Sequence, residues 1–345
     1  MWAVDNQTPF KADRAFARDA EGAEIWIVAV RATFEIQRSG TVVPAREQQD
    51  VCLAPKYFGE PGKSSLTYDM DLVRTKPGTD VILNAVAHSP RGEPTEALEV
   101  GFRLGPLAKS LRLVGDRVWE STPLGLAPSV PQPFVSMPIQ YERALGGLFS
   151  LEPGAPHDPQ NPVGTGRIAV AGQPVPNCEW PNEAIRSPQA ESLPAGFGAI
   201  PCDWQQRTKL AGTYDEAWQK ERQPLVPKDF QDAYFHCAPV DQQVNGFLQG
   251  GEEVVLRNLT PEGLLRFTLP RVSLGFRTRI DGGTTHHRGQ LHTVIIEPEV
   301  RRLIMVWQTA LPCHHTLYTL KETAVFEKER VPLGGKDEPE AELVS

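Results

Sequence analysis

Apolar and polar residues follow strand-like patterns in the first third of the chain. Many residues between Ala23 and Ile36 are β-branched or aromatic, and Ile25–Val30 is apolar without interruption. A short continuous apolar run predicts a strand that is buried on both faces. Leu98–Leu104 and Ser110–Trp119 alternate strongly, which predicts a hairpin, and Asp80–Ser89 predicts a further strand before it. We therefore expect the N-terminal third to be a meander of short strands.

The C-terminal third has the same character. A meander is predicted over Glu252–Leu259, Leu264–Pro270 and Leu274–Ile280, and a hairpin that turns at Glu299–Val300 is predicted after it. A last strand is expected within His315–Glu327. Closely spaced short strands are typical of sandwiches and barrels. The predicted fold class is mostly β, with two strand-rich, sandwich- or barrel-like halves.

The region between these halves differs in composition. Between Pro123 and Pro239 lie 18 of the 32 prolines, and proline lacks the N–H that a central strand needs. Within this region, Asn161–Val244, here called the central stretch, is rich in proline, glycine and aromatic residues and shows little strand alternation. Long loops without regular structure are usually functional or disordered, and the aromatic residues argue against disorder. We expect the central stretch to be ordered and to carry the function.

One or two short helices are predicted in the central stretch, and the one with clear signals lies near residues 214–222. Thr213 and Glu216 have the spacing of a capping box, and Pro224 follows the last turn. Tyr214 and Trp218 fall on one helical face, which either packs on the body or contacts a partner. The predicted regions are 1–122, a β meander; 123–244, irregular with this helix; 245–333, a second β region; and 334–345, an acidic tail expected to be disordered.

Composition narrows the function classes. Apolar residues make up 40% and charged residues 23% of the chain, as in a globular protein with a real core. The formal net charge of −8 disfavours nucleic-acid binding, which usually needs a basic patch. No signal peptide and no apolar run near the length of about 18 residues needed for a membrane span are present. We expect a cytoplasmic protein with five reduced cysteines and no membrane partner.

The sequence shows no common catalytic or cofactor motif. It lacks a phosphate-binding loop, a nucleophile elbow, a metalloprotease helix and a paired-cysteine motif. No cofactor, metal or catalytic set is predicted. The C-terminal histidines match no zinc spacing, and we interpret them as turn and surface residues; they are His286, His287, His292, His314 and His315. Carboxylates of the central stretch keep a carbohydrate-active or other hydrolytic enzyme on a β scaffold open as an alternative.

Aromatic and arginine side chains are the most informative chemistry of the central stretch. Trp, Tyr and Arg are the residue types enriched at the centres of protein interfaces. The simpler interpretation is that such side chains anchor loops to the β body. The candidate residues for binding a protein partner are Trp180, Arg186, Phe197, Trp204, Arg207, Tyr214, Trp218, Tyr234 and Phe235.

The order of many short segments resembles an uncharacterised-domain family found beside bacterial type VI secretion genes, whose members are described as accessory or adaptor proteins. The segments cover most of the chain outside the tail. They are Thr8–Phe10, Val28–Phe34, Tyr57–Leu72, Lys76–Gly92, Gly105–Trp119, Pro133–Gly147, Asn161–Arg167, Pro194–Pro201, Ala211–Phe230, Ala238–Val244 and Gly250–Gly263. The chain departs from the expected pattern at Cys202, at His236–Cys237 and in a histidine-rich loop around His286.

The resemblance implies a cytoplasmic, non-enzymatic adaptor or chaperone. Such a protein holds a secreted effector and helps to load it onto the secretion spike protein or its tip cap. The resemblance does not say which residues bind the partner, so the candidate residues above rest on their chemistry alone. A structural component of the secretion apparatus stays open as a second alternative.

Overall fold

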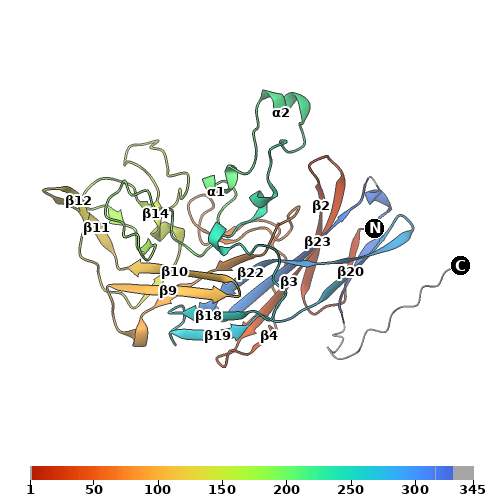
Figure 1. The fold of residues 1–345 in the computed structure, drawn as a ribbon, viewed down its shortest axis with the longest axis horizontal. Helices are drawn as coiled ribbons and strands as arrows, with labels where there is room; N and C mark the ends of the chain where they lie inside the picture. Colours follow the sequence, from red (N-terminus) through yellow and green to blue (C-terminus); the bar gives the residue numbers. More distant parts are fainter. Residues whose placement is uncertain (1, 315, 329–345) are drawn as a thin grey trace.

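The computed structural model describes residues 2–314 and 316–328 (Figure 1). The predicted tail, 334–345, and His315 lie outside the described residues. Strands account for 42% of the structure and helices for 9%, which confirms the predicted mostly β class. The described residues form several open sheets and no closed barrel.

The largest sheet has six strands and mixes both ends of the chain. In spatial order its strands are β2 (Lys11–Arg18), β3 (Glu24–Ile36), β23 (Arg302–Pro312), β22 (Gln290–Glu297) and β7 (Asp80–Leu83), and β4 (Val42–Pro44) also pairs with β3. β3 and β23 pair antiparallel over eleven positions, and β7 lies parallel to β22. The predicted burial of β3 on both faces is confirmed, since Trp26 and Ile27 are both 1% exposed or less.

Two further large sheets flank this one. The five-stranded sheet runs β17 (Cys178–Glu179), β10 (Leu107–Val114), β9 (Ala97–Leu104), β18 (Glu253–Arg257) and β19 (Leu264–Thr268). The four-stranded sheet runs β1 (Ala3–Asn6), β24 (Glu322–Glu327), β20 (Leu274–Ile280) and β21 (Gly283–Arg288). The predicted hairpins at β9–β10 and β22–β23 are confirmed. Because each large sheet contains strands from early and late in the chain, the two strand-rich ends do not form separate sheets.

The remaining elements are short. The small sheets are β12 (Gly125–Pro128), β11 (Arg117–Thr122) and β16 (Pro174–Val175); β13 (Ser136–Pro138) and β8 (Val86–His88); β14 (Leu145–Gly146) and β15 (Thr165–Gly166); and β5 (Lys56–Tyr57) and β6 (Leu66–Tyr68). The helices are α1 (Gln205–Thr208) and α2 (Glu216–Glu221), with 3-10 turns η1 (Pro90–Gly92), η2 (Tyr141–Arg143), η3 (Asp232–Phe235), η4 (Val240–Gln242), η5 (Pro298–Val300) and η6 (Leu317–Thr319). Among the described residues, no helix is long and apolar enough to cross a membrane.

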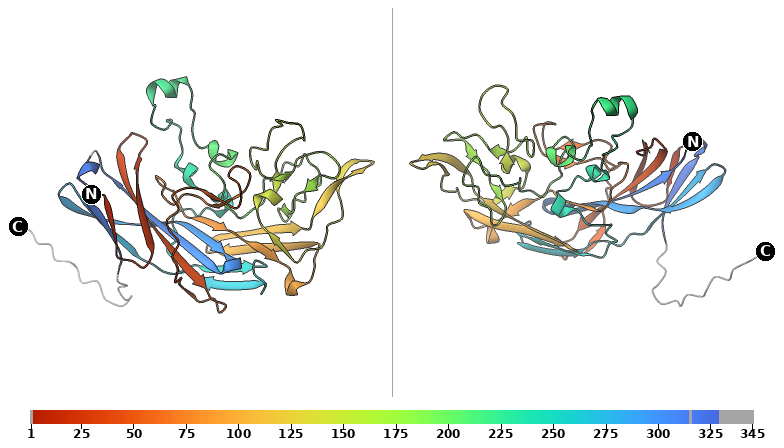
Figure 2. Two further views of the ribbon diagram at one scale, coloured as in Figure 1. Left: turned by 180° about the vertical axis from the view of Figure 1, so that it is seen from behind. Right: turned by 45° about the horizontal axis from the view of Figure 1, so that its top comes forward.

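The six-stranded sheet is covered on both faces. One face, including Trp26, Val28 and Val30 of β3, belongs to the main core shared with the other large sheets. The opposite face, including Ile82 and Ile304, packs against a smaller cluster that contains Cys237 of the central stretch. The central stretch therefore serves as part of the cover for this face, and Figures 1 and 2 show it as irregular chain on one side of the sheets.

The end of the central stretch is held against the segment before β7 by backbone contacts. The N–H of Val244 donates to the carbonyl of Thr79, and the N–H of Thr79 donates to the carbonyl of Gly246, both at 2.9 Å. A Cβ on Gly78 would lie 2.0 Å from the carbonyl oxygen of Val244. Only glycine fits this close approach between two chain segments.

We therefore expect Gly78→Ala to lower the free energy of unfolding by about 1–3 kcal/mol, the usual cost of overpacking. Denaturant unfolding measures the change. Gly283→Ala is the matched control, because its added Cβ would meet no atom closer than 3.7 Å. An equal loss in both variants would contradict the close-approach argument.

Candidate functional site

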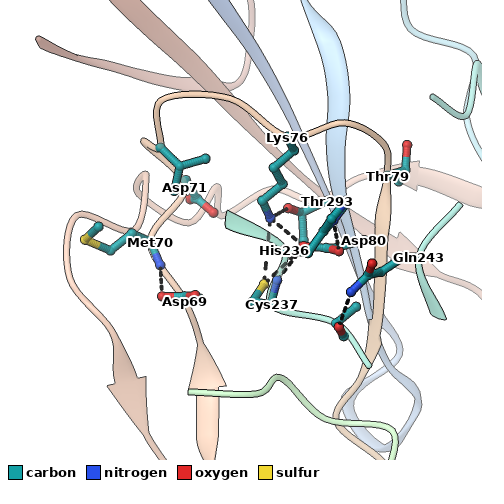
Figure 3. Close-up of polar contacts among 12 residues, drawn as sticks. Asp69, Met70, Asp71, Lys76, Thr79, Asp80, His236, Cys237, Gln243 and Thr293 are labelled. Atoms are coloured by element: carbon teal, nitrogen blue, oxygen red, sulfur yellow. Dashed lines mark hydrogen bonds and ion pairs between the residues drawn. The ribbon is translucent and has the colours of Figure 1, made fainter. Parts of the chain in front are cut away.

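Five buried polar side chains meet beneath the central stretch, and we call them the buried cluster (Figure 3). They are Lys76, Asp80, His236, Cys237 and Thr293, each at most 6% exposed. Asp80 begins β7 and is the direct cross-strand partner of Thr293 on β22, whereas His236 and Cys237 follow η3. The buried cluster thus joins the central stretch to the six-stranded sheet.

Asp80 is the centre of the buried cluster. Its Oδ2 accepts hydrogen bonds from Lys76 Nζ at 2.7 Å and from the Cys237 backbone N–H at 2.9 Å. Its Oδ1 lies 2.6 Å from Nδ1 of His236. Lys76 Nζ also donates to Thr293 Oγ1 at 3.0 Å. Both carboxylate oxygens therefore have partners, as a buried charge requires.

The electrostatics of the buried cluster favour a fixed ion pair. Burial alone would raise the pKa of Asp80, but Lys76 and His236 hold that pKa below its usual range. Burial alone would lower the pKa of Lys76, yet Asp80 keeps it above the ordinary value. Burial raises the pKa of the Cys237 thiol well above that of a free cysteine. A buried thiol with a raised pKa is inert as a nucleophile, so the geometry suits a clamp better than a catalytic triad.

His292 lies beside the buried cluster and is uncharged. It is 4% exposed, its ring stacks on Phe247 with centroids 5.7 Å apart, and its Nδ1 has no hydrogen-bond partner. Burial, together with the nearby Lys76 charge, lowers the pKa of His292 to about 3. The interpretation of His292 as a turn or surface residue is therefore wrong: it belongs to strand β22 and faces the interior.

This burial predicts an acid-sensitive contribution to stability. The unfolded chain takes up a proton at His292 as pH falls below about 6.5, whereas the folded chain does not until about pH 3, so stability falls as pH decreases. Between pH 7 and pH 5 the expected loss from His292 is about 2 kcal/mol. His292→Phe keeps a ring against Phe247 and should remove this part of the pH dependence. Denaturant unfolding of both proteins at the two pH values checks it; an unchanged pH dependence would contradict the assignment.

Two further buried cations fasten the central stretch to its surroundings. Arg207 of α1 donates to Asp69 Oδ2 at 2.6 Å and to the carbonyl of Ile200 at 2.9 Å. Lys109 of β10 donates to Asp241 Oδ1 at 2.9 Å and to Gln242 Oε1 at 2.8 Å. Burial lowers the pKa of Lys109 to about 8, although Asp241 opposes the shift. The central stretch is therefore held at several points by buried polar contacts.

The structure divides the candidate binding residues into two groups. Phe197, Trp204 and Arg207 are buried at 0%, 3% and 6% exposure. The Phe197 ring packs edge-on against Phe102, and Trp204 packs against Tyr141, with centroids 5.5 and 5.2 Å apart. These three residues anchor the central stretch to the body, as the simpler interpretation held, and present no surface to a partner.

The other candidates reach the surface to different degrees. Trp180 is half-buried over Lys109 Nζ, which lies 5.0 Å from its ring centroid, and Arg186 is exposed. Tyr234 and Phe235 are half-buried in η3, within 5.7 Å of one another between ring centroids. Tyr214 is 53% exposed. Trp218 of α2 is half-buried beneath it.

Tyr214 and Trp218 belong to a projecting segment, Thr213–Asp229, which we call the arm. Figures 1 and 2 show α2 at its tip, standing away from the sheets in each view. The rings of Tyr214 and Trp218 are 4.7 Å apart in an edge-to-face contact, and Trp218 Nε1 donates to the carbonyl of Leu225 at 2.7 Å. The arm thus presents an aromatic pair on a locally packed support.

The two ends of the arm are joined by hydrogen bonds. Asp229 accepts from the backbone N–H of Thr213 at 3.0 Å and from its hydroxyl at 2.8 Å. The predicted capping role of Thr213 is therefore wrong. Asp215 caps α2 instead, accepting from the backbone N–H of Trp218 at 2.8 Å. The predicted helix itself is present and slightly shorter.

One surface hollow that could hold a small ligand has no carboxylate pair. This hollow of about 370 Å³ is lined largely by glycine-rich backbone from Gly146–Leu148 and Pro162–Gly166, with no Asp or Glu among its lining residues. In the central stretch, Asp215 caps α2, Asp229 closes the arm and Asp241 pairs with Lys109. Within residues 2–314 and 316–328, no three His, Cys, Asp or Glu side chains converge as metal ligands would.

A comparison with known protein families identifies the family of this chain. Residues 21–308 match a family described as an uncharacterized protein conserved in bacteria (DUF2169). The chain belongs to DUF2169. Searches of curated proteins and of solved structures found no match. The DUF2169 match contains the buried cluster and the arm, and leaves out β1, β2 and β24.

The positions at which this DUF2169 chain departs from the expected pattern have different surroundings. His236 and Cys237 are members of the buried cluster. Cys202 is exposed near the start of α1. The segment around His286 is not a loop but strand β21.

The sequence pattern of this DUF2169 protein does not indicate that Lys76 and Asp80 form a buried pair. A Lys and an Asp four residues apart around a Pro-Gly turn give no signal of burial, since such pairs are usually exposed. One signal was present: an apolar run starts directly after Asp80, so this carboxylate stands at the first position of a buried strand.

Proposed function

We propose that this DUF2169 protein is a cytoplasmic adaptor that binds a secreted effector of a type VI secretion system and helps to load it onto the spike. The order of the sequence segments resembles that of accessory proteins encoded beside type VI secretion genes, and this resemblance supports a role in that system. The arm supports the mode of action, because it offers the exposed Tyr214 ring, supported by the half-buried Trp218, on a segment whose two ends are joined.

Large exposed apolar side chains are frequent in the middle of the chain. Of the 18 large apolar side chains that are exposed in the described part of the chain, nine lie between Leu124 and Val240. Leu124, at the turn between β11 and β12, is fully exposed. Such side chains mark a binding surface where they gather into one patch, and Tyr214 is the member of this set that the arm carries.

The arm is suited to binding because much of its shape is set before the partner arrives. The Thr213–Asp229 contacts close its neck, and Arg222 donates to the carbonyl of Ala20 on the turn between β2 and β3. A preorganised segment loses less conformational freedom on binding than a flexible one. A stable interface with the effector buries at least about 1,000 Å². It would therefore extend from the arm onto other residues of the central stretch.

Co-expression with the effector encoded beside its gene tests the proposal. The expected result is a stable complex on affinity and size-exclusion chromatography, together with loss of effector secretion when the adaptor gene is deleted. Two results would overturn the adaptor role: an effector that is soluble and secreted without this protein, or recovery of this protein in the secreted spike fraction, as for a structural component.

A further inference from the structure

The outer face of the four-stranded sheet is basic in a chain with a net charge of −8. On β20, Phe276 and Thr278 point into the core at 1% and 0% exposure, so the alternate residues Arg277 and Arg279 point outward and are exposed. Their neighbours on β21 are His286, paired with Arg277, and Arg288, which is also exposed. We call Arg277, Arg279, His286 and Arg288 the basic face.

The basic face has few carboxylates of its own. Arg279 pairs with Glu322 of β24 at 2.8 Å. The guanidinium of Arg277 lies over the Phe326 ring, 6.0 Å from its centroid. Within the described part of the chain, neither Arg277 nor Arg288 forms an ion pair with a carboxylate. Two guanidinium groups are therefore available for acidic groups of another molecule.

β21 also forms an open edge of this sheet. It pairs with β20 at six consecutive positions, from Gly283 opposite Ile280 to Arg288 opposite Gly275, with no bulge. In the described residues no strand pairs with its other side. Proteins usually protect such edges with charged side chains, proline or a bulge. β21 has no proline and no bulge, and Arg288 is its one formally charged residue. Its outer backbone groups can therefore accept a further strand.

We propose that the edge of β21 binds an extended segment of a partner protein, with acidic residues at alternating positions, which adds to the sheet as a fifth strand. Residues of an added strand alternate between the two faces of the sheet, so every second side chain would lie beside Arg288 and His286. Main-chain hydrogen bonds provide affinity, and the basic face selects carboxylates. This surface is separate from the arm, and the inference does not rest on the adaptor role.

The test is fluorescence polarisation with the full chain and a labelled peptide of sequence Glu-Val-Glu-Thr-Glu-Val-Glu. The expected result is saturable binding that weakens at high salt and falls at least about tenfold for a peptide with lysine in place of glutamate. A peptide with alternate backbone amides methylated should also lose binding, because it cannot pair with a strand edge.

Variants of the chain locate the site. R277E/R288E should weaken binding at least about tenfold, and the conservative R277K/R288K should retain most of it. Thermal melting checks that these exposed substitutions leave the fold intact. Three outcomes would overturn the proposal: no binding to wild type, equal binding of the methylated peptide, or equal loss with a control, R112E, on the separate five-stranded sheet.

This chain's own acidic tail is the rival occupant. A peptide of residues 334–345, which contains Asp337, Glu338, Glu340 and Glu342, serves as a second probe. Glu338, Glu340 and Glu342 of this peptide alternate as in the first probe, but Pro339 lacks the N–H that strand pairing needs, so the proposal expects it to bind at least about tenfold more weakly. Equal or tighter binding would identify the tail as the occupant and overturn the assignment to a partner.

Discussion

Replacing Asp80 by alanine is expected to lower the free energy of unfolding by about 3–5 kcal/mol, the range for removing one member of a buried ion pair. Asp80 is fully buried and accepts hydrogen bonds from Lys76 and from the Cys237 backbone. Without the carboxylate, the Lys76 ammonium stays in the interior without its counter-ion, and the Cys237 N–H loses its acceptor. Guanidinium unfolding followed by tryptophan fluorescence measures the loss.

Two further variants make this prediction specific. Lys76→Met should cost less than Asp80→Ala, because His236 and the Cys237 N–H still contact the carboxylate. Asp50→Ala removes the partner of Lys11 at the surface, where the Asp50 side chain is 86% exposed, and should cost under about 1 kcal/mol. If Asp80→Ala were as mild as Asp50→Ala, the buried cluster would not be what holds the central stretch to the sheet.

Replacing both Tyr214 and Trp218 by alanine is expected to weaken effector binding at least about 30-fold, since interface aromatic residues of this kind contribute about 2 kcal/mol or more. Tyr214 is the exposed ring of the pair, and Trp218 supports it through the edge-to-face contact. Isothermal titration with the co-purified effector measures the change.

Single variants distinguish a residue that contacts the effector from one that only holds the arm in shape. Tyr214→Ala removes an exposed ring and should weaken binding while leaving the melting temperature unchanged. Trp218→Ala also removes the hydrogen bond to Leu225, so a change in melting temperature is expected with it. Tyr318→Ala is the matched control, because this exposed tyrosine lies on η6, outside the central stretch. Unchanged binding in the double variant would exclude the arm as the effector contact.

The basic face exists because strand pairing brings basic side chains from two segments onto one side of a sheet. Arg277 and Arg288 are eleven positions apart in the sequence, and no local pattern shows that the two lie on one face. Antiparallel pairing of β20 with β21 sets them on one face, and the net negative charge of the chain makes that face distinct.

Local sequence was sufficient for elements whose signal lies within a few residues. The apolar run of β3, the alternation of β9 and β10, the turn before β23 and the helix α2 were all predictable, because side-chain burial in a strand or helix follows a short period. The mostly β class follows from the sum of these elements. Thr213 is a position where local pattern was not sufficient. The pattern assigned its hydroxyl to a helix cap, but in the structure the hydroxyl donates to the Asp229 carboxylate, 16 residues away.

The sequence by itself determined the strand content, the irregular central stretch and the helix of the arm. Tertiary structure alone decided that β3 pairs with β23, that Phe197 and Trp204 are buried, and that Asp80 meets His236 from 156 residues away. The physical reason is that sheet pairing and burial of charge depend on partners distant in the chain, and no local period encodes which partner is chosen.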